Sequence, residues 1–135
     1  MKDNSRSSDH DAIEAVAMDY AEGWYTGDAE RMARALHPSF IKRTLVQDEE
    51  GGWTIDRARS RDGMVSLTED GEGKAFKGKL VFETQILDVF RDIATVRCLS
   101  AEYVDYLHLA RLGRDGWKIV NVLWQLREGE FRPDS

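Results

Sequence analysis

The sequence predicts an α+β domain in which helices come first and a curved antiparallel sheet follows. Helical spacing of apolar residues dominates the start of the chain, whereas strand-like runs dominate its second half. The runs at 93–110 and 117–126 are rich in β-branched and aromatic residues, and the Arg114-Asp115-Gly116 turn between them is typical of a hairpin. Strands usually have about five or six residues, so a strand at 93–110 would have to curve or carry a bulge, most simply around a helix.

Two helices are expected near the N-terminus and a third later in the chain. The first should begin at His10 and bury one face, because its apolar residues follow helical spacing. Gly27 should end this helix, and Asp28 can cap a short second helix at 29–36. The third is expected at 61–69. The buried stripe of the first helix comprises Ile13, Val16, Ala17, Tyr20, Ala21 and Trp24.

Three further strands are expected before the long hairpin. Residues 40–47 and 53–59 should pair about a polar turn, and residues 80–90 should lead through Arg91-Asp92 into the hairpin. A Gly-rich loop is expected at 70–78.

The chain of 135 residues is expected to form one domain at 10–127, between a disordered tail at 1–9 and a frayed tail at 128–135. No repeat or linker divides it. No apolar run approaches the roughly 20 residues of a membrane span, and the polar start of the sequence is unlike a signal peptide. We therefore expect a cytoplasmic protein with no membrane partner.

Charge and residue spacing exclude several classes of partner. The formal net charge of −6 argues against nucleic acid, because neutralising phosphates needs a surplus of Lys and Arg. Cys98 is the single cysteine, which excludes an intramolecular disulfide, and His10, His37 and His108 show no ligand spacing. No phosphate-binding loop occurs. We expect neither a metal nor a cofactor.

Four motifs occur in order along most of the chain, from about residue 10 to residue 126. They are Ala17-Met18-Asp19-Tyr20, Trp24-Tyr25-Thr26-Gly27-Asp28, Leu36-His37-Pro38-Ser39-Phe40 and Gly116-Trp117-Lys118-Ile119-Val120-Asn121. Their order resembles the nuclear transport factor 2-like superfamily, close to its SnoaL-like members. Within it, the combination of His37-Pro38 with Asp105-Tyr106-Leu107 and Trp117-Lys118-Ile119-Val120-Asn121 most resembles the lumazine-binding branch.

The resemblance implies a cone, in which a strongly curved mixed or antiparallel sheet wraps around three helices and encloses a pocket. Members usually form homodimers through the outer face of the sheet. The residues independently agree, because both faces of the 93–110 run carry apolar side chains and a sheet apolar on both faces needs cover on both. One face would hold Ile93, Leu99 and Leu107, and the other Val96, Val104 and Tyr106.

Comparison with the ketosteroid isomerase pattern places Tyr20 and Asp105 at the two oxyanion donors of that enzyme. The general base is missing, since its position falls near Arg43-Thr44 and no carboxylate stands between His37 and Gln47. We therefore reject an isomerase of that type.

Three functions stay open from the sequence. The first is a binding domain for a flat, partly polar compound such as a pterin- or flavin-like ring; the second is a cofactor-independent dehydratase, isomerase or cyclase that uses Tyr20 and Asp105, with His37 as a candidate base; the third is a dimerising accessory module. Asp105 could equally form a satisfied buried pair with Tyr20, and His37 could cap a helix. If no bulge intervenes, Arg97 and Tyr103 share a face with Asp105. The candidate ligand-binding residues are Tyr20, Trp24, His37, Arg43, Arg97, Tyr103, Asp105 and Asn121.

Overall fold

The computed structural model describes the backbone of residues 4–127 and the side chains of residues 8–127. The tails predicted at 1–3 and 128–135 lie outside the described residues. The first helix begins at Asn4, so the prediction of a disordered segment up to residue 9 is wrong for 4–9. The helices are α1 (Asn4–Thr26), α2 (Ala29–Ala35) and α3 (Arg61–Glu69), with short 3-10 turns at Gly73–Ala75 and Gly113–Asp115.

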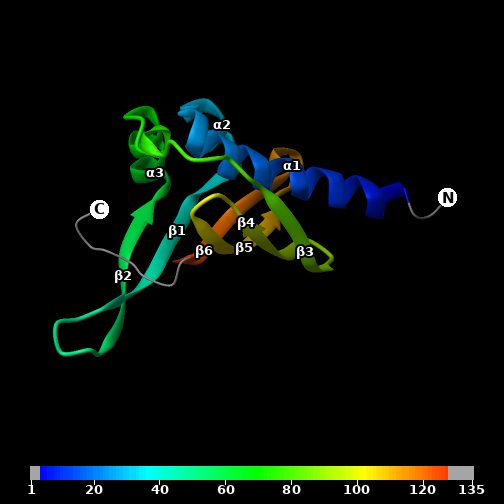
Figure 1. Ribbon diagram of the computed structural model, residues 1–135. Coiled ribbons are helices and arrows are strands. Elements are labelled where there is room, and N and C mark those ends of the chain that lie inside the picture. The colour runs from blue at the N-terminus through cyan, green and yellow to red at the C-terminus, as the bar shows by residue number, and fades with distance from the viewer. Residues whose placement is uncertain (1–3, 128–135) are drawn as a thin grey trace.

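A single mixed sheet packs against the three helices (Figure 1). Its six strands are arranged in the order β2-β1-β6-β5-β4-β3. Neighbouring strands are antiparallel except β1 and β6, which run parallel. The sheet is therefore curved but not closed. The strands are β1 (Leu36–Gln47), β2 (Trp53–Ser60), β3 (Glu83–Phe90), β4 (Ile93–Leu99), β5 (Tyr103–Arg111) and β6 (Trp117–Leu126).

The predicted long strand at 93–110 is wrong, because the chain reverses within it. β4 and β5 form an antiparallel hairpin in which Leu99 pairs with Val104. The turn is closed by a hydrogen bond from the Ser100 amide to the Tyr103 carbonyl, 2.9 Å long. The Tyr25 hydroxyl also accepts a hydrogen bond from the Glu102 amide at 3.1 Å. The turn thus relies on a side chain of α1 in place of the Gly or Pro that usually marks a turn in sequence.

The core lies between α1 and the inner, concave face of the sheet. Apolar side chains of α1 pack on the alternate residues of β4, β5 and β6 that face inward, while α2 and α3 extend this core towards β1. In Figure 1 the β1–β2 hairpin projects away from this core. None of the described helices is long and apolar enough to cross a membrane. The most deeply buried residues include Ile13, Ala17, Met32, Phe40, Val96, Leu107, Ile119 and Val122.

Candidate ligand-binding site

A cavity of about 140 Å³ lies where α1, α3, β1, β2, β5 and β6 meet. A much smaller hollow of about 10 Å³ continues from it towards the core. The hollow has room for roughly one water molecule. Both spaces are lined by Trp24, Lys42 and Tyr103, which therefore lie between the cavity and the inner hollow. The cavity is also lined by Arg57, Arg59, Met64, Leu67, Glu72 and Trp124, and the hollow by Tyr20, Ala21, Tyr25, Cys98, Ser100 and Asp105.

Tyr20 and Asp105 form a buried pair at the inner hollow. The Tyr20 hydroxyl donates to Asp105 Oδ2 over 2.5 Å, and the two residues are only 3% and 5% exposed. Burial raises the pKa of Asp105, although the positive charge of Lys42 and the hydrogen bond from Tyr20 act in the opposite sense. Burial also raises the pKa of Tyr20 well above its usual value, and the neighbouring Asp105 raises it further.

Tyr20 and Asp105 do not form an oxyanion hole in this arrangement. In the ketosteroid isomerase pattern both side chains donate to the substrate oxygen, whereas here the Tyr20 hydroxyl donates its hydrogen bond to Asp105. A substrate oxygen would have to break that bond to receive the Tyr20 proton. The pair is satisfied only at Asp105 Oδ2, because Asp105 Oδ1 has no hydrogen-bond partner among the described residues.

Two buried polar atoms at the site have no hydrogen-bond partner among the described residues. They are Asp105 Oδ1 and Trp24 Nε1, and their residues line the hollow and the cavity. An unpaired buried donor or acceptor costs roughly 1–3 kcal/mol. A bound molecule or a water can recover that free energy by pairing with these atoms.

Lys42 lines both spaces but was not a candidate from the sequence, and neither were Arg57, Arg59 and Trp124 of the cavity. Lys42 lies on β1 between Phe40 and Thr44, which face inward and are only 1% exposed. Its Nζ atom lies 5.0 Å from the ring centroid of Tyr20, 5.9 Å from Trp24, 5.7 Å from Tyr103 and 5.5 Å from Trp124. A lysine two residues from Phe40 on an inward-facing strand was the available signal.

A β-bulge in β2 brings positive charge to the mouth of the cavity. In the strand register, Lys42 lies opposite Arg59 and Thr44 lies opposite Asp56. Two residues of β2, at 57 and 58, therefore lie opposite the single residue Arg43 of β1. At the bulge, Arg57 has the left-handed φ of 60° and its amide donates to Asp56 Oδ1 at 2.7 Å. The side chains of Arg57 and Arg59 both line the cavity.

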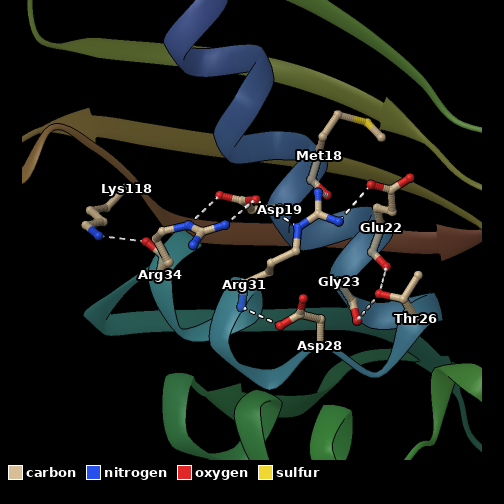
Figure 2. A network of polar contacts seen from close by, with 9 residues as sticks. All are labelled: Met18, Asp19, Glu22, Gly23, Thr26, Asp28, Arg31, Arg34 and Lys118. Carbon is tan, nitrogen blue, oxygen red and sulfur yellow. Dashed lines mark hydrogen bonds and ion pairs between the residues drawn. The ribbon is translucent and has the colours of Figure 1, made fainter.

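Polar contacts with α2 hold the outer side of α1, and so fix the turn that carries Tyr20 and Trp24 (Figure 2). Asp19 accepts from Arg31 Nε at 3.0 Å and from Arg34 Nε at 3.0 Å. Arg31 also pairs with Glu22 at 2.7 Å. These contacts come from the face of α1 opposite the core, so they orient the helix without occupying the cavity.

Glycines let the backbone fold closely around Trp24. Gly27 has a φ of 71° and follows the last residue of α1, where the Asp28 amide donates to the Gly23 carbonyl at 2.9 Å. This is the Schellman ending that favours glycine. Gly73 packs so closely on α1 that a Cβ atom there would lie 2.2 Å from the Trp24 carbonyl oxygen. The predicted loop at 70–78 therefore supports the wall of the cavity.

Of the candidates predicted from sequence, Tyr20, Trp24, Tyr103 and Asp105 meet at this site. Arg97 and Asn121 do not line either space. The inward residues of β4 are the buried Ala94, Val96 and Cys98, so Arg97 lies on the outer face, where it pairs in register with the exposed Tyr106. The predicted common face for Arg97 and Asp105 is therefore wrong, because the turn at 100–102 resets the alternation.

Asn121, a candidate ligand-binding residue from the sequence, does not reach the cavity because of a bulge in β6. His108 pairs with Asn121 but the next residue, Leu109, pairs with Ile119. The extra residue turns Asn121 to the outer face, where its Nδ2 lies 3.2 Å from Nδ1 of the exposed His108.

His37 and Arg43 also lie away from the cavity. The His37 Nδ1 atom accepts a hydrogen bond from the Ser39 amide at 2.9 Å. This contact lies within β1, so His37 does not cap α2 as the sequence suggested; the α2 C-cap is Leu36. Arg43 is exposed because it alternates with the inward-facing Lys42 and Thr44. Among residues 8–127, no cluster of three or more His, Cys, Asp or Glu side chains could hold a metal ion.

Solved structures with the same fold cover nearly the whole chain. A nuclear transport factor 2-like protein of unknown function from Silicibacter pomeroyi DSS-3 aligns with a TM-score of 0.64 and 22% identity, over 90% of this chain and 98% of its own. A ketosteroid isomerase-like protein from Erwinia carotovora atroseptica aligns with a TM-score of 0.60 and 13% identity, over 86% of this chain and 94% of its own. These likenesses show the fold alone.

An enzyme is also among the structural neighbours. The LinA-type3 hexachlorocyclohexane dehydrochlorinase from Novosphingobium barchaimii LL02 aligns with a TM-score of 0.63 and 15% identity, over 93% of this chain and 91% of its own. No curated protein matches the sequence significantly. The family model described as "Putative lumazine-binding" matches residues 8–125. The chain therefore belongs to that family, and it has the fold of the nuclear transport factor 2-like proteins.

Proposed function

We propose that the chain binds a small, flat ring compound with an acidic group, such as a pterin- or flavin-like fragment, in the cavity beside Trp24. The observation that carries the proposal is the combination of aromatic walls and positive charge. Trp24, Tyr103 and Trp124 supply the walls, while Lys42, Arg57 and Arg59 outnumber the single acidic residue at the cavity, Glu72. A chain with a net charge of −6 has concentrated cations here.

The walls suit a flat ligand because the rings already meet at defined angles. Tyr103 and Trp124 pack edge to face, with centroids 5.0 Å apart and planes at 82°. The ligand's ring would lie against Trp24, where a carbonyl or ring nitrogen can accept from the unpaired Nε1. Met64 and Leu67 of α3 would cover its opposite side.

The charge and the volume of the cavity limit which ligands can bind. An anionic or acidic group of the ligand would lie near Arg59 and Lys42, since Arg and Lys donate strongly to such groups. The cavity of about 140 Å³ lies well below the roughly 300–1,000 Å³ of sites for drug-sized ligands. A compound of one or two fused rings fits this space better than a whole dinucleotide.

Binding of lumazine, a two-ring compound, by isothermal titration and tryptophan fluorescence tests the proposal, with riboflavin and flavin mononucleotide as larger three-ring comparisons. Trp24→Phe removes the Nε1 donor but keeps a ring, and Arg59→Gln removes the charge. Each variant should weaken binding roughly tenfold, because a lost hydrogen bond to a charged or polar ligand costs about 1–2 kcal/mol. Arg97→Gln is the matched control, since Arg97 lies on the outer face; it should change affinity less than about twofold.

Absence of saturable binding for all three probes would contradict the proposed ligand class. Equal affinity in Trp24→Phe and the wild type would place the ligand elsewhere. If native mass spectrometry of the purified protein then finds no small molecule, the accessory-module alternative gains weight.

We also propose that the outer face of the sheet forms a homodimer. Several large apolar side chains on or beside this face are exposed: Phe90 by 61%, Ile93 by 59%, Tyr106 by 45% and Leu123 by 44%. A patch of this kind on a small domain marks an interface more often than a free surface. Size-exclusion chromatography with light scattering should give a dimer for the wild type and a monomer for Ile93→Lys. A monomeric wild type at micromolar concentration would overturn the dimer.

A further inference from the structure

We propose that Lys42 is a nucleophilic amine that forms an imine with a small aldehyde or ketone carrying an acidic group. The inference deepens the proposed function, and rests on it in one respect: the cavity beside Lys42 must admit a ligand. It adds a covalent step that ring binding does not require.

The first argument is that Lys42 is held in place without an ion pair. Its Nζ lies within 5.0–5.9 Å of four ring centroids supplied by α1, β5 and β6. No hydrogen bond or salt bridge joins Nζ to any of the described side chains. The charge of Asp105, which also lines the hollow, attracts it, but the hydrogen bond of that carboxylate is to Tyr20. A lysine whose role is purely structural would be expected to pair with an acid.

The second argument concerns which forms of the amine this environment favours. Burial lowers the pKa of Lys42, Asp105 raises it, and the positive charge of Arg59 lowers it again. The neutral, nucleophilic form is thus more accessible than for a lysine in water. The four ring faces favour a cation at the Nζ position. A protonated imine carries the same positive charge on the same nitrogen as the ammonium, so the aromatic cage would stabilise reactant and product alike and would not oppose the reaction.

The third argument is that a proton acceptor lies within the same hollow. Asp105 Oδ1 has no partner among the described residues, and Asp105 and Lys42 line the hollow together. One water in the hollow would relay a proton from the Lys42 ammonium to Asp105, because no hydrogen bond joins the two side chains directly. The free amine would then attack the carbonyl carbon. After a proton moves from nitrogen to the new alkoxide, the neutral carbinolamine forms. Asp105 then returns its proton to the hydroxyl group, which leaves as water, and the protonated imine remains.

The charge balance of this sequence is complete. One ammonium and one carbonyl compound give one protonated imine and one water, and Asp105 ends as it began. No oxidant or reductant is needed. The acidic group of the substrate would lie near the cavity mouth, where Arg59 lines the wall.

Trapping with glyoxylate and sodium cyanoborohydride tests the inference. The reductant converts an imine to a stable secondary amine, which peptide mass mapping assigns to one lysine. Lys42 should be modified at least tenfold faster than the exposed Lys74 and Lys77 of the same molecule. Lys42→Arg keeps the charge but cannot form an imine and should abolish the fast phase, whereas Lys74→Arg should leave it unchanged.

Modification of Lys42 no faster than of Lys74 in the folded wild type would overturn the inference. This comparison lies within one protein, so it holds even if Lys42→Arg fails to fold. Failure of the proposed ring binding has a separate signature: fast trapping at Lys42 without binding of lumazine or flavins. Binding of those rings with an inert Lys42 would remove the imine alone.

Discussion

Replacing Tyr20 with Phe isolates the hydrogen bond at the centre of the site. The ring is retained, so packing in the core should change little, but Asp105 Oδ2 loses the donor that lies 2.5 Å away. Because Asp105 Oδ1 is already unpaired, the buried carboxyl would then have no partner at either oxygen. Hydrogen bonds to charged groups contribute roughly 1.5–3 kcal/mol, and an orphaned buried acceptor costs a similar amount. We expect the free energy of unfolding to fall by about 1.5–3 kcal/mol, or the Tm by roughly 5–12 °C.

Urea unfolding followed by circular dichroism measures this change, and an unchanged m-value would show that the unfolded state is unaffected. Glu50→Gln is the control, since Glu50 is exposed in the turn between β1 and β2; it should change stability by less than about 0.5 kcal/mol. In an Asp105→Asn background the cost of Tyr20→Phe should fall to about 1 kcal/mol, because the acceptor is then neutral. A cost below about 0.5 kcal/mol in the wild-type background would refute the reasoning.

The remaining predictions concern pH, the wall of the cavity and the helix clamp. Burial raises the folded-state pKa of Asp105, so its contribution to stability is fully present below the unfolded pKa and is lost as pH rises through the folded pKa. Asp105→Asn should therefore gain stability over the wild type from pH 4 to pH 7 in urea titrations, by about 1.4 kcal/mol for each pH unit that separates the folded from the unfolded pKa. A stability difference that does not change with pH would contradict this prediction. Gly73→Ala should destabilise the fold by roughly 1–3 kcal/mol and weaken lumazine binding, because its Cβ would meet the Trp24 carbonyl; wild-type stability and affinity in this variant would show that the loop can yield. Burial acts to raise the pKa of Asp19, but hydrogen bonds from Arg34 and Arg31 outweigh it and lower the pKa; Asp19→Asn should cost roughly 1–2 kcal/mol at pH 7, and urea titrations should show that cost shrinking only as the pH falls below the unfolded pKa and through the lowered folded-state pKa.

Local signals in the sequence were sufficient for most of the elements. Helical spacing and the Gly27-Asp28 pair placed the junction of α1 and α2, and the Asp-Gly turn placed the start of β6 at Trp117. The turn between β4 and β5 carries no such signal, since Ser100-Ala101-Glu102 has neither Gly nor Pro. Its reversal depends on contacts from Tyr25, which lies on α1. Tertiary contacts of this kind cannot be read from residue spacing.

The sequence also could not fully predict which side chains of each strand face the cavity. Alternation along a strand predicts a face only while the strand is regular. Asn121 lies on the outer face because of the bulge in β6. Arg97 lies on the outer face because the chain reverses after Leu99. Tyr20 and Asp105 were predictable because the resemblance supplied their pairing, which spacing could not.

The position of Lys42 depends both on the face of its strand and on tertiary contacts, because its amine lies among four rings from three other elements. Its inward direction follows from Phe40 and Thr44 on the same strand, but nothing local shows that the apolar face around it is aromatic. A basic side chain on an inward face usually carries a desolvation cost that a carboxylate repays. Here ring faces take part of that role, and the carboxylate of Asp105 is engaged by Tyr20 instead. The amine therefore remains available to a ligand in the cavity, at the side of the site where the ketosteroid isomerase pattern would place its missing base.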